Sequence, residues 1–160
     1  MIKKIGFGGG CHWCTEAIFQ ALIGVKKVDQ GWIASVSPYQ NFSEGVIVYY
    51  DDCEISLKVL IEIHLLTHSS TSLHKMREKY RSAIYYFNTD DKLIITDVLE
   101  QLEIENNLKY ITQNIPYIAF KQNIEEQLNY YTKNKTAPFC KTYIDPKLSL
   151  LKKQYAKVVR

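Results

Sequence analysis

The chain has 160 residues, of which 46% are hydrophobic and 23% charged, and its formal net charge is +3. These values fit one globular domain, spanning 1–160, that buries most of its apolar surface; four cysteines are too few for a disulfide-stapled scaffold. The start of the chain lacks the apolar segment of a signal peptide, and the longest apolar run, LKVLIEIHLL, carries a Lys, a Glu and a His. We therefore expect a cytoplasmic protein with reduced thiols and no membrane partner.

Hydrophobic periodicity predicts strands and helices in mixed order, with no linker, repeat or low-complexity segment between them. A strand at 3–8 precedes a helix at 15–22, and two strands at 25–33 and 45–52 precede a helix at 56–68. A strand at 82–87, a helix at about 90–102, a strand at 115–120, a helix at 124–134 and a helix from about Pro146 follow. The alternation is less regular than in a doubly wound sheet. The sequence therefore predicts an α+β domain in which helices pack on a mixed or mainly antiparallel sheet.

The C-terminal helix carries an excess of positive charge. The last twenty residues hold six Lys or Arg against one Asp, an excess that can mark a nucleic-acid-binding arm. The cations of DPKLSLLKKQYAKVVR are spaced as the polar face of an amphipathic helix, and no nucleic-acid-binding motif accompanies them. We expect a solvated helix face and no nucleic-acid partner.

Cys11 and Cys14 stand where the first strand and its run of glycines meet the first helix. Backbone N–H groups in the first turn of a helix favour a thiolate, so we expect this position to lower the pKa of Cys11. The glycines leave room for a substrate above the sulfur. Trp13 adds an apolar wall that suits a methyl or thioether group.

Other interpretations of this cysteine pair stay open on the residues alone. A zinc site would need a second close Cys or His doublet, and His64 with His68, spaced i, i+4 far downstream, is the nearest approach to one. A thioredoxin-like dithiol pair would need a βαβ setting. A third interpretation is that both cysteines are small core residues packed at a strand-to-helix turn.

The run GGCHWCTEAIF resembles the active-site signature of the class A peptide methionine sulfoxide reductases, which reads Gly-Gly-Cys-Phe-Trp, a small or Cys residue, a variable residue and Glu. Further blocks follow in the family's order: GVKKVDQGW, SEGVIVYYDD, THSSTSLH, KYRSAIYY and YYTKNKTAPFCKTYIDPKLSLLKK. The resemblance spans nearly the whole chain. It implies a ferredoxin-like two-layer core with a recycling-cysteine tail at about 132–160.

The resemblance also implies a role for individual residues. Cys11 matches the nucleophile that attacks the sulfoxide sulfur, Glu44 the acid that protonates the departing oxygen, and Tyr80 a hydrogen-bond donor to that oxygen. Such an acid must stay protonated near neutral pH, so we expect an apolar pocket around Glu44. Cys140 matches the recycling cysteine, which condenses with the Cys11 sulfenic acid to a disulfide.

The implied activity is thiol-dependent reduction of methionine S-sulfoxide, free or in oxidised proteins and peptides, as protein repair under oxidative stress. The resemblance implies thioredoxin or another dithiol as reductant, no cofactor, no metal, and a monomer. A dithiol-disulfide oxidoreductase that uses Cys11 and Cys14 is one alternative. A catalytically impaired family member that acts as a binding domain is another.

The chain departs from the family pattern around the substrate. Trp13 matches the family's aromatic wall, but His12 stands in place of a Phe and Trp32 in place of an oxygen-binding Tyr; we assign all three to substrate binding. An Asp of the oxygen site is missing, and Glu78 is the nearest carboxylate. We expect a working but slow or respecialised enzyme, with Cys14 as either a packing residue or a second resolving thiol, and Cys53 as a bystander.

Overall fold

The structure is a computed structural model that describes residues 1–72 and 79–160. Its strands are β1 (Ile2–Gly8), β2 (Val25–Ala34), β3 (Ser43–Asp51), β4 (Ala83–Tyr86), β5 (Gln113–Pro116) and β6 (Ala119–Gln122). Its α-helices are α1 (His12–Gln20), α2 (Leu57–Leu66), α3 (Thr89–Asn106), α4 (Tyr130–Lys133) and α5 (Asp145–Gln154). Short 3₁₀ or π-helical turns form η1 (Glu125–Gln127), η2 (Cys140–Ile144) and η3 (Ala156–Val158).

The six strands form one mixed sheet in the order β5-β4-β1-β3-β2-β6. Every neighbouring pair is antiparallel except β4 and β5, which run parallel. The first four strands, with α1 and α2 between them, follow βαββαβ order and lie as β4-β1-β3-β2, which is the ferredoxin-like arrangement. The predicted α+β class with packed helices is confirmed.

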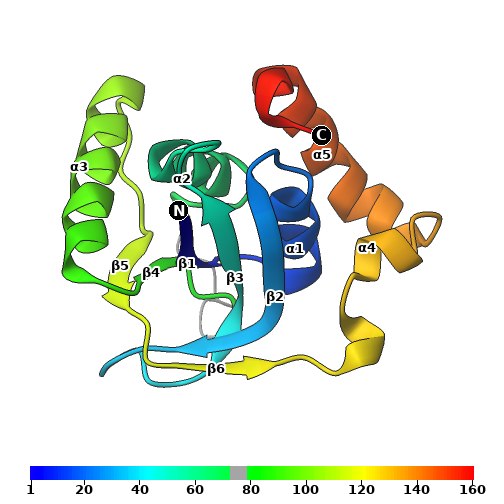
Figure 1. The fold of residues 1–160 in the computed structure, drawn as a ribbon, viewed down its shortest axis with the longest axis horizontal. Coiled ribbons are helices and arrows are strands. Elements are labelled where there is room, and N and C mark those ends of the chain that lie inside the picture. The colour runs from blue at the N-terminus through cyan, green and yellow to red at the C-terminus, as the bar shows by residue number, and fades with distance from the viewer. Residues whose placement is uncertain (73–78) are drawn as a thin grey trace.

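The main core lies between the sheet and the helices α1 and α2, which cover one of its faces (Figure 1). Alternate residues of the central strands point into this layer, as the period of two in a strand requires. Phe7 of β1 stacks on Phe19 of α1 with ring centroids 4.7 Å apart. The opposite face carries a smaller cluster built around Ile33, Ile47 and Tyr85, with partly buried aromatic rings packed against it. The helix layer therefore fixes where α1, and with it Cys11, meets the sheet.

The prediction of one strand at 115–120 is wrong, because two strands pair with opposite edges of the sheet. β5 pairs with β4 and β6 pairs with β2. Between them, Pro116 O accepts a hydrogen bond from Ser35 Oγ and Ile118 N–H donates to Ala34 O. This segment therefore joins the two edges at one end of the sheet.

The continuous helix predicted at 124–134 is also wrong. The chain forms η1 and α4, separated at Asn129, whose φ of 55° is left-handed. The N–H groups of Asn129 and Tyr130 donate to the Glu16 carboxylate instead of extending a helix. The C-terminal helix begins before Pro146, with η2 leading directly into α5. No helix of the two described segments combines the length and the apolar character that a bilayer span requires.

Candidate active site

Cys11 is the N-cap residue of α1, and its carbonyl accepts from the N–H groups of Cys14 and Thr15. The preceding loop passes close to the end of α2. Gly9 has a φ of +148°, and a Cβ at this position would lie 2.5 Å from Cδ2 of His68. Because no other residue fits this conformation and contact, the glycine run sets the path that delivers the Cys11 sulfur to the surface of the sheet.

Sheet register brings the other implied catalytic residues to the same place. Gly8 pairs with Gly45 on β3 and with Ala83 on β4. Glu44, which precedes Gly45, and Tyr80, which lies three residues before Ala83, therefore flank the end of β1. The Glu44 N–H and the Ser43 hydroxyl both donate to Lys79 O, at 2.9 Å each, and fix the backbone next to Tyr80.

Cys11 and Cys14 lie one helical turn apart and share a hydrogen bond between their thiols. This bond, followed by burial, raises the pKa of Cys11, although the Trp13 N–H acts in the opposite direction. The same bond lowers the pKa of Cys14, and the charge of Lys147 contributes. The lowering expected at Cys11 is therefore found at Cys14 instead, so the pair gives up its first proton more easily than its second.

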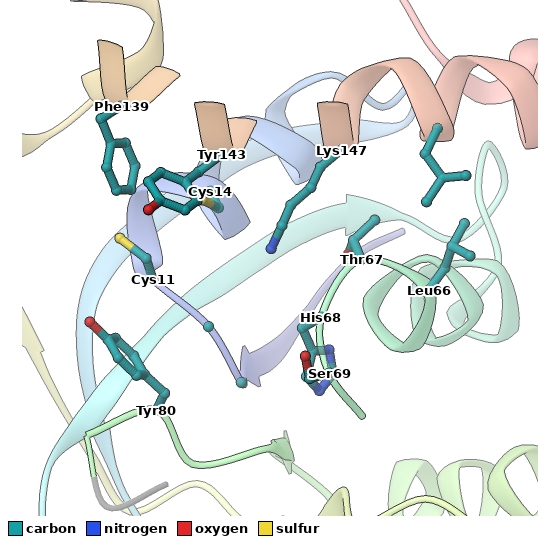
Figure 2. A pocket seen from close by; sticks show the side chains of 13 residues that line it. Cys11, Cys14, Leu66, Thr67, His68, Ser69, Tyr80, Phe139, Tyr143 and Lys147 are labelled. Carbon is teal, nitrogen blue, oxygen red and sulfur yellow. The ribbon is translucent and has the colours of Figure 1, made fainter. Parts of the chain in front are cut away.

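A cavity of about 540 Å³ opens at these two thiols. Figure 2 shows the Tyr80 hydroxyl directed toward the Cys11 sulfur from below, while Phe139 and Tyr143 descend from the C-terminal tail on the other side. The described residues that line it are Gly9, Gly10, Cys11, Cys14, Leu66, Thr67, His68, Ser69, Tyr80, Phe139, Tyr143, Lys147 and Leu150. The cavity is large enough for a side chain the size of methionine sulfoxide and exposes a nucleophilic sulfur to it.

Glu44 is only 5% exposed at the start of β3, but its surroundings are not the expected apolar pocket. Its Oε1 accepts from the His12 backbone N–H at 3.2 Å, and its Oε2 lies 3.5 Å from the Lys79 amine. The carboxylate is thus tied to the residue that follows Cys11, and its charge acts on the Cys11 thiol. Polar and cationic partners, which the strand pattern did not indicate, take the place of apolar neighbours.

The His12 ring is buried against β2 and is not among the described residues that line the cavity. Its Nδ1–H donates to Gly31 O at 3.0 Å, and its Nε2 lies 3.3 Å from Asn123 Nδ2 and 3.5 Å from Glu44 Oε1. Trp32 packs edge-on against the same ring, with centroids 5.2 Å apart. His12 and Trp32 therefore surround Glu44 and do not line the cavity itself.

Trp13 is not among the described residues that line the cavity but packs in an aromatic cluster with the tail. Its indole stacks on Tyr130 with centroids 3.8 Å apart and meets Phe139 edge-on at 5.2 Å. Glu16, 1% exposed, holds Tyr130 in place by accepting the Tyr130 and Asn129 N–H groups and the amide of Gln30. The signature Glu was visible in the sequence, but its contacts with the tail were not.

Cys140 is fully buried in η2, in a cluster with Cys14, Ala17 and Ile144. Burial, with Asp145 and Cys14 as further causes, raises the pKa of its thiol. All four cysteines are free, and Cys53 is exposed far from the cluster along the chain. The residues Cys11, Cys14 and Cys140 therefore belong to one packed cluster.

Of the remaining candidates, His68 lines the cavity, His64 lies outside its described lining, and one falls outside the described residues. His64 Nε2–H donates to Gly8 O at 2.7 Å, and His68 Nε2 lies 2.7 Å from Ser82 Oγ. Among the residues that the structure describes, the cluster with potential metal ligands is Asp51, Asp52 and Cys53, away from the cavity. Glu78 lies outside the described residues. Sequence reasoning missed Lys147 and Tyr143 as cavity residues, since only the folded tail brings them over Cys11.

Three comparisons bear on this arrangement. The sequence profile of the family described as "Peptide methionine sulfoxide reductase" matches residues 3–159. A relative called peptide methionine sulfoxide reductase MsrA, from Sulfolobus acidocaldarius, is 30% identical over 162 residues that cover 92% of each chain. Mxr1 from Saccharomyces cerevisiae shares the fold: its reduced form gives a TM-score of 0.75 at 21% identity, covering 89% of this chain and 91% of that one. Mxr1 in complex with Trx2 gives 0.64 at 20% identity, with 81% and 84% covered. The chain belongs to the peptide methionine sulfoxide reductase family.

Proposed function

We propose that this family member reduces the S epimer of methionine sulfoxide with Cys11 as the nucleophile, Glu44 as the proton donor and Tyr80 as the hydrogen-bond donor to the sulfoxide oxygen. One observation carries the proposal: the Cys11 thiol and the Tyr80 hydroxyl share a cavity, next to a carboxylate bonded to the residue after Cys11. The alternatives, a dithiol oxidoreductase and a binding domain, are not favoured by membership of this family.

The first half-reaction moves one oxygen atom between two sulfurs. The Cys11 thiolate attacks the sulfoxide sulfur, the acid protonates the departing oxygen, and the products are methionine and a Cys11 sulfenic acid. The substrate sulfur is reduced by two electrons and the Cys11 sulfur is oxidised by two. Cys11 has to lose its proton before the attack, and we assign the neighbouring Cys14 sulfur as the base that takes it.

Recycling uses the two buried thiols in sequence. The Cys14 thiol, already hydrogen-bonded to Cys11, condenses with the sulfenic acid and releases water. Cys140, which belongs to the same buried cluster as Cys14, then attacks that disulfide and frees Cys11. A dithiol such as thioredoxin reduces the final Cys14–Cys140 disulfide, a partner supported by the Mxr1 complex with Trx2. We propose that the cycle needs no cofactor besides this dithiol. The protein acts as a monomer in a reducing cytoplasm.

The test is turnover of racemic methionine sulfoxide with dithiothreitol. The protein should consume half of the substrate, and Cys11→Ser should abolish turnover, whereas Cys53→Ser should match the wild type because Cys53 is exposed and outside the thiol cluster. Without reductant, two methionines should form per chain, because the Cys14–Cys140 disulfide leaves Cys11 free to attack a second sulfoxide. Equal turnover of wild type and Cys11→Ser would refute the proposal.

Mass mapping of protein quenched after one turnover tests the recycling order. We expect a Cys11–Cys14 disulfide in Cys140→Ser and a Cys14–Cys140 disulfide in the wild type. A Cys11–Cys140 disulfide in the wild type, retained in Cys14→Ser at an unchanged rate, would show that Cys14 is only a packing residue.

A further inference from the structure

The cavity extends beyond the thiols toward a single lysine. Lys147 projects from α5, and Figure 2 shows its amine directed into the cavity, between the cysteines and the end of α2. Most of the surface that the cavity offers is apolar, supplied by side chains such as Leu66, Phe139 and Leu150. A substrate attacked by Cys11 at one end therefore extends past a positive charge.

This charge has no carboxylate partner in the described parts of the chain. No Asp or Glu of these residues lies within ion-pair distance of the Lys147 amine, and none lines the cavity. The side chain is half-buried, and its charge acts on Cys14. A half-buried ammonium without a carboxylate partner favours an anionic ligand more strongly than a fully hydrated one does.

Methionine sulfoxide can supply that anion. Three carbon atoms separate its sulfur from the carboxylate carbon, so a molecule whose sulfur lies at Cys11 carries its carboxylate a short distance along the cavity. A methionine sulfoxide inside a peptide chain has an amide at that point and gains nothing from the lysine. A carboxylate gains a charge-assisted hydrogen bond.

The same charge pattern disfavours a free α-ammonium group. A zwitterion would place its own positive charge in a cavity whose described lining holds Lys147 and no carboxylate. An acylated nitrogen is neutral and avoids this repulsion. On the basis of the proposed function, we propose that Lys147 forms a carboxylate subsite that selects methionine sulfoxide with a free carboxylate and an acylated nitrogen, as in the C-terminal residue of a peptide or an N-acyl amino acid.

The experiment compares matched substrates. N-acetyl-methionine sulfoxide carries the carboxylate, its N-methylamide carries an amide instead, and free methionine sulfoxide carries both charges; a dipeptide ending in methionine sulfoxide distinguishes a peptide C-terminus from an acyl amino acid. We expect kcat/KM for the acetylated acid to exceed that for the methylamide about tenfold, mainly through KM, and to exceed that for the free amino acid.

Lys147→Gln should remove the preference for the carboxylate, Lys147→Arg should retain most of it, and Lys153→Gln, an exposed residue of the same helix, should leave it unchanged. An effect of Lys147 on Cys14 alone changes all substrates equally, so their ratio isolates the subsite. Turnover of the methylamide as fast as the acid in the wild type, or an unchanged ratio in Lys147→Gln, overturns the subsite while leaving the proposed function intact. No turnover of any substrate overturns both.

Discussion

His12 is the residue at which this chain differs most from the signature of its family, and its ring bonds to the framework around Glu44. Nδ1 must carry the proton that Gly31 O accepts, which leaves Nε2 of the neutral ring to accept from Asn123. His12 could be identified from the sequence as a departure from the family pattern, and its ring was assigned to substrate binding. Its orientation depends on a carbonyl nineteen residues away on β2, which no local pattern reports.

We predict that His12→Phe lowers the free energy of unfolding by about 1–3 kcal/mol, because buried Gly31 O loses its partner, whereas the Asn123 amide keeps its bond to Gln30 Oε1. Urea denaturation monitored by tryptophan fluorescence measures the change. His12→Asn, which can still donate to Gly31 O, should recover part of the loss. A His12→Phe variant more stable than the wild type would show that the family's Phe suits this fold better and that these hydrogen bonds contribute nothing net.

At the scale of elements, the tail from η1 to α5 owes its position to α1. Glu16 binds two backbone N–H groups where η1 gives way to α4, and the tail then places Tyr130 on Trp13. Sequence periodicity predicted a single helix here. The spacing of apolar residues carries no information about an acceptor on another element, such as the Glu16 carboxylate. By contrast, β1, β2, β3 and α2 were predicted to within two residues, because runs of β-branched and aromatic residues and a buried helical stripe are local properties.

We predict that Glu16→Gln speeds amide hydrogen exchange in the segment 124–134 while leaving exchange in β1 and β3 unchanged. A glutamine offers one acceptor where three donors meet, so one backbone N–H loses its partner. Disulfide formation by Cys140 should slow, so the first methionine per chain should still form at the wild-type rate while the second, which needs Cys11 to be freed, forms more slowly. Glu125→Gln, an exposed change in the same segment, serves as the control. Unchanged exchange at 124–134 would mean that aromatic stacking alone holds the tail.

At the scale of the whole molecule, the C-terminal end of the chain closes over its N-terminal half. Ile23 N–H donates to Val158 O, Arg160 N–H donates to Ala21 O, and the Tyr155 hydroxyl donates to Glu62 Oε2 at 2.9 Å. The four implied catalytic residues could be picked out from motifs in the sequence. That they lie near one another could not, because their proximity depends on which strands are neighbours and on where the tail folds. Strand neighbours far apart in sequence bring Glu44 and Tyr80 to Cys11, and the closing tail brings Cys140.

We predict that this closure weakens at high pH. Burial and the bond to Glu62 raise the pKa of Tyr155 to about 12, above its value of about 10 in the unfolded chain. Its contribution to stability is therefore fully present below about pH 10 and is lost as the pH rises through about 12. Tyr155→Phe should cost less than about 1 kcal/mol near pH 9, because the bond is partly exposed to water, and less still near pH 12. Urea unfolding at both pH values measures this, and a difference that grows with pH contradicts it.

The complete burial of Cys140 makes the size of the reductant a kinetic variable. A thiolate displaces a sulfur along the axis of the disulfide, so a protein reductant needs more open space around its target than a small dithiol does. For a disulfide that includes Cys140, that space exists only after η2 and its aromatic neighbours Phe139 and Tyr143 have moved aside. The ratio of thioredoxin-driven to dithiothreitol-driven turnover is therefore a direct reading of how often this short turn opens.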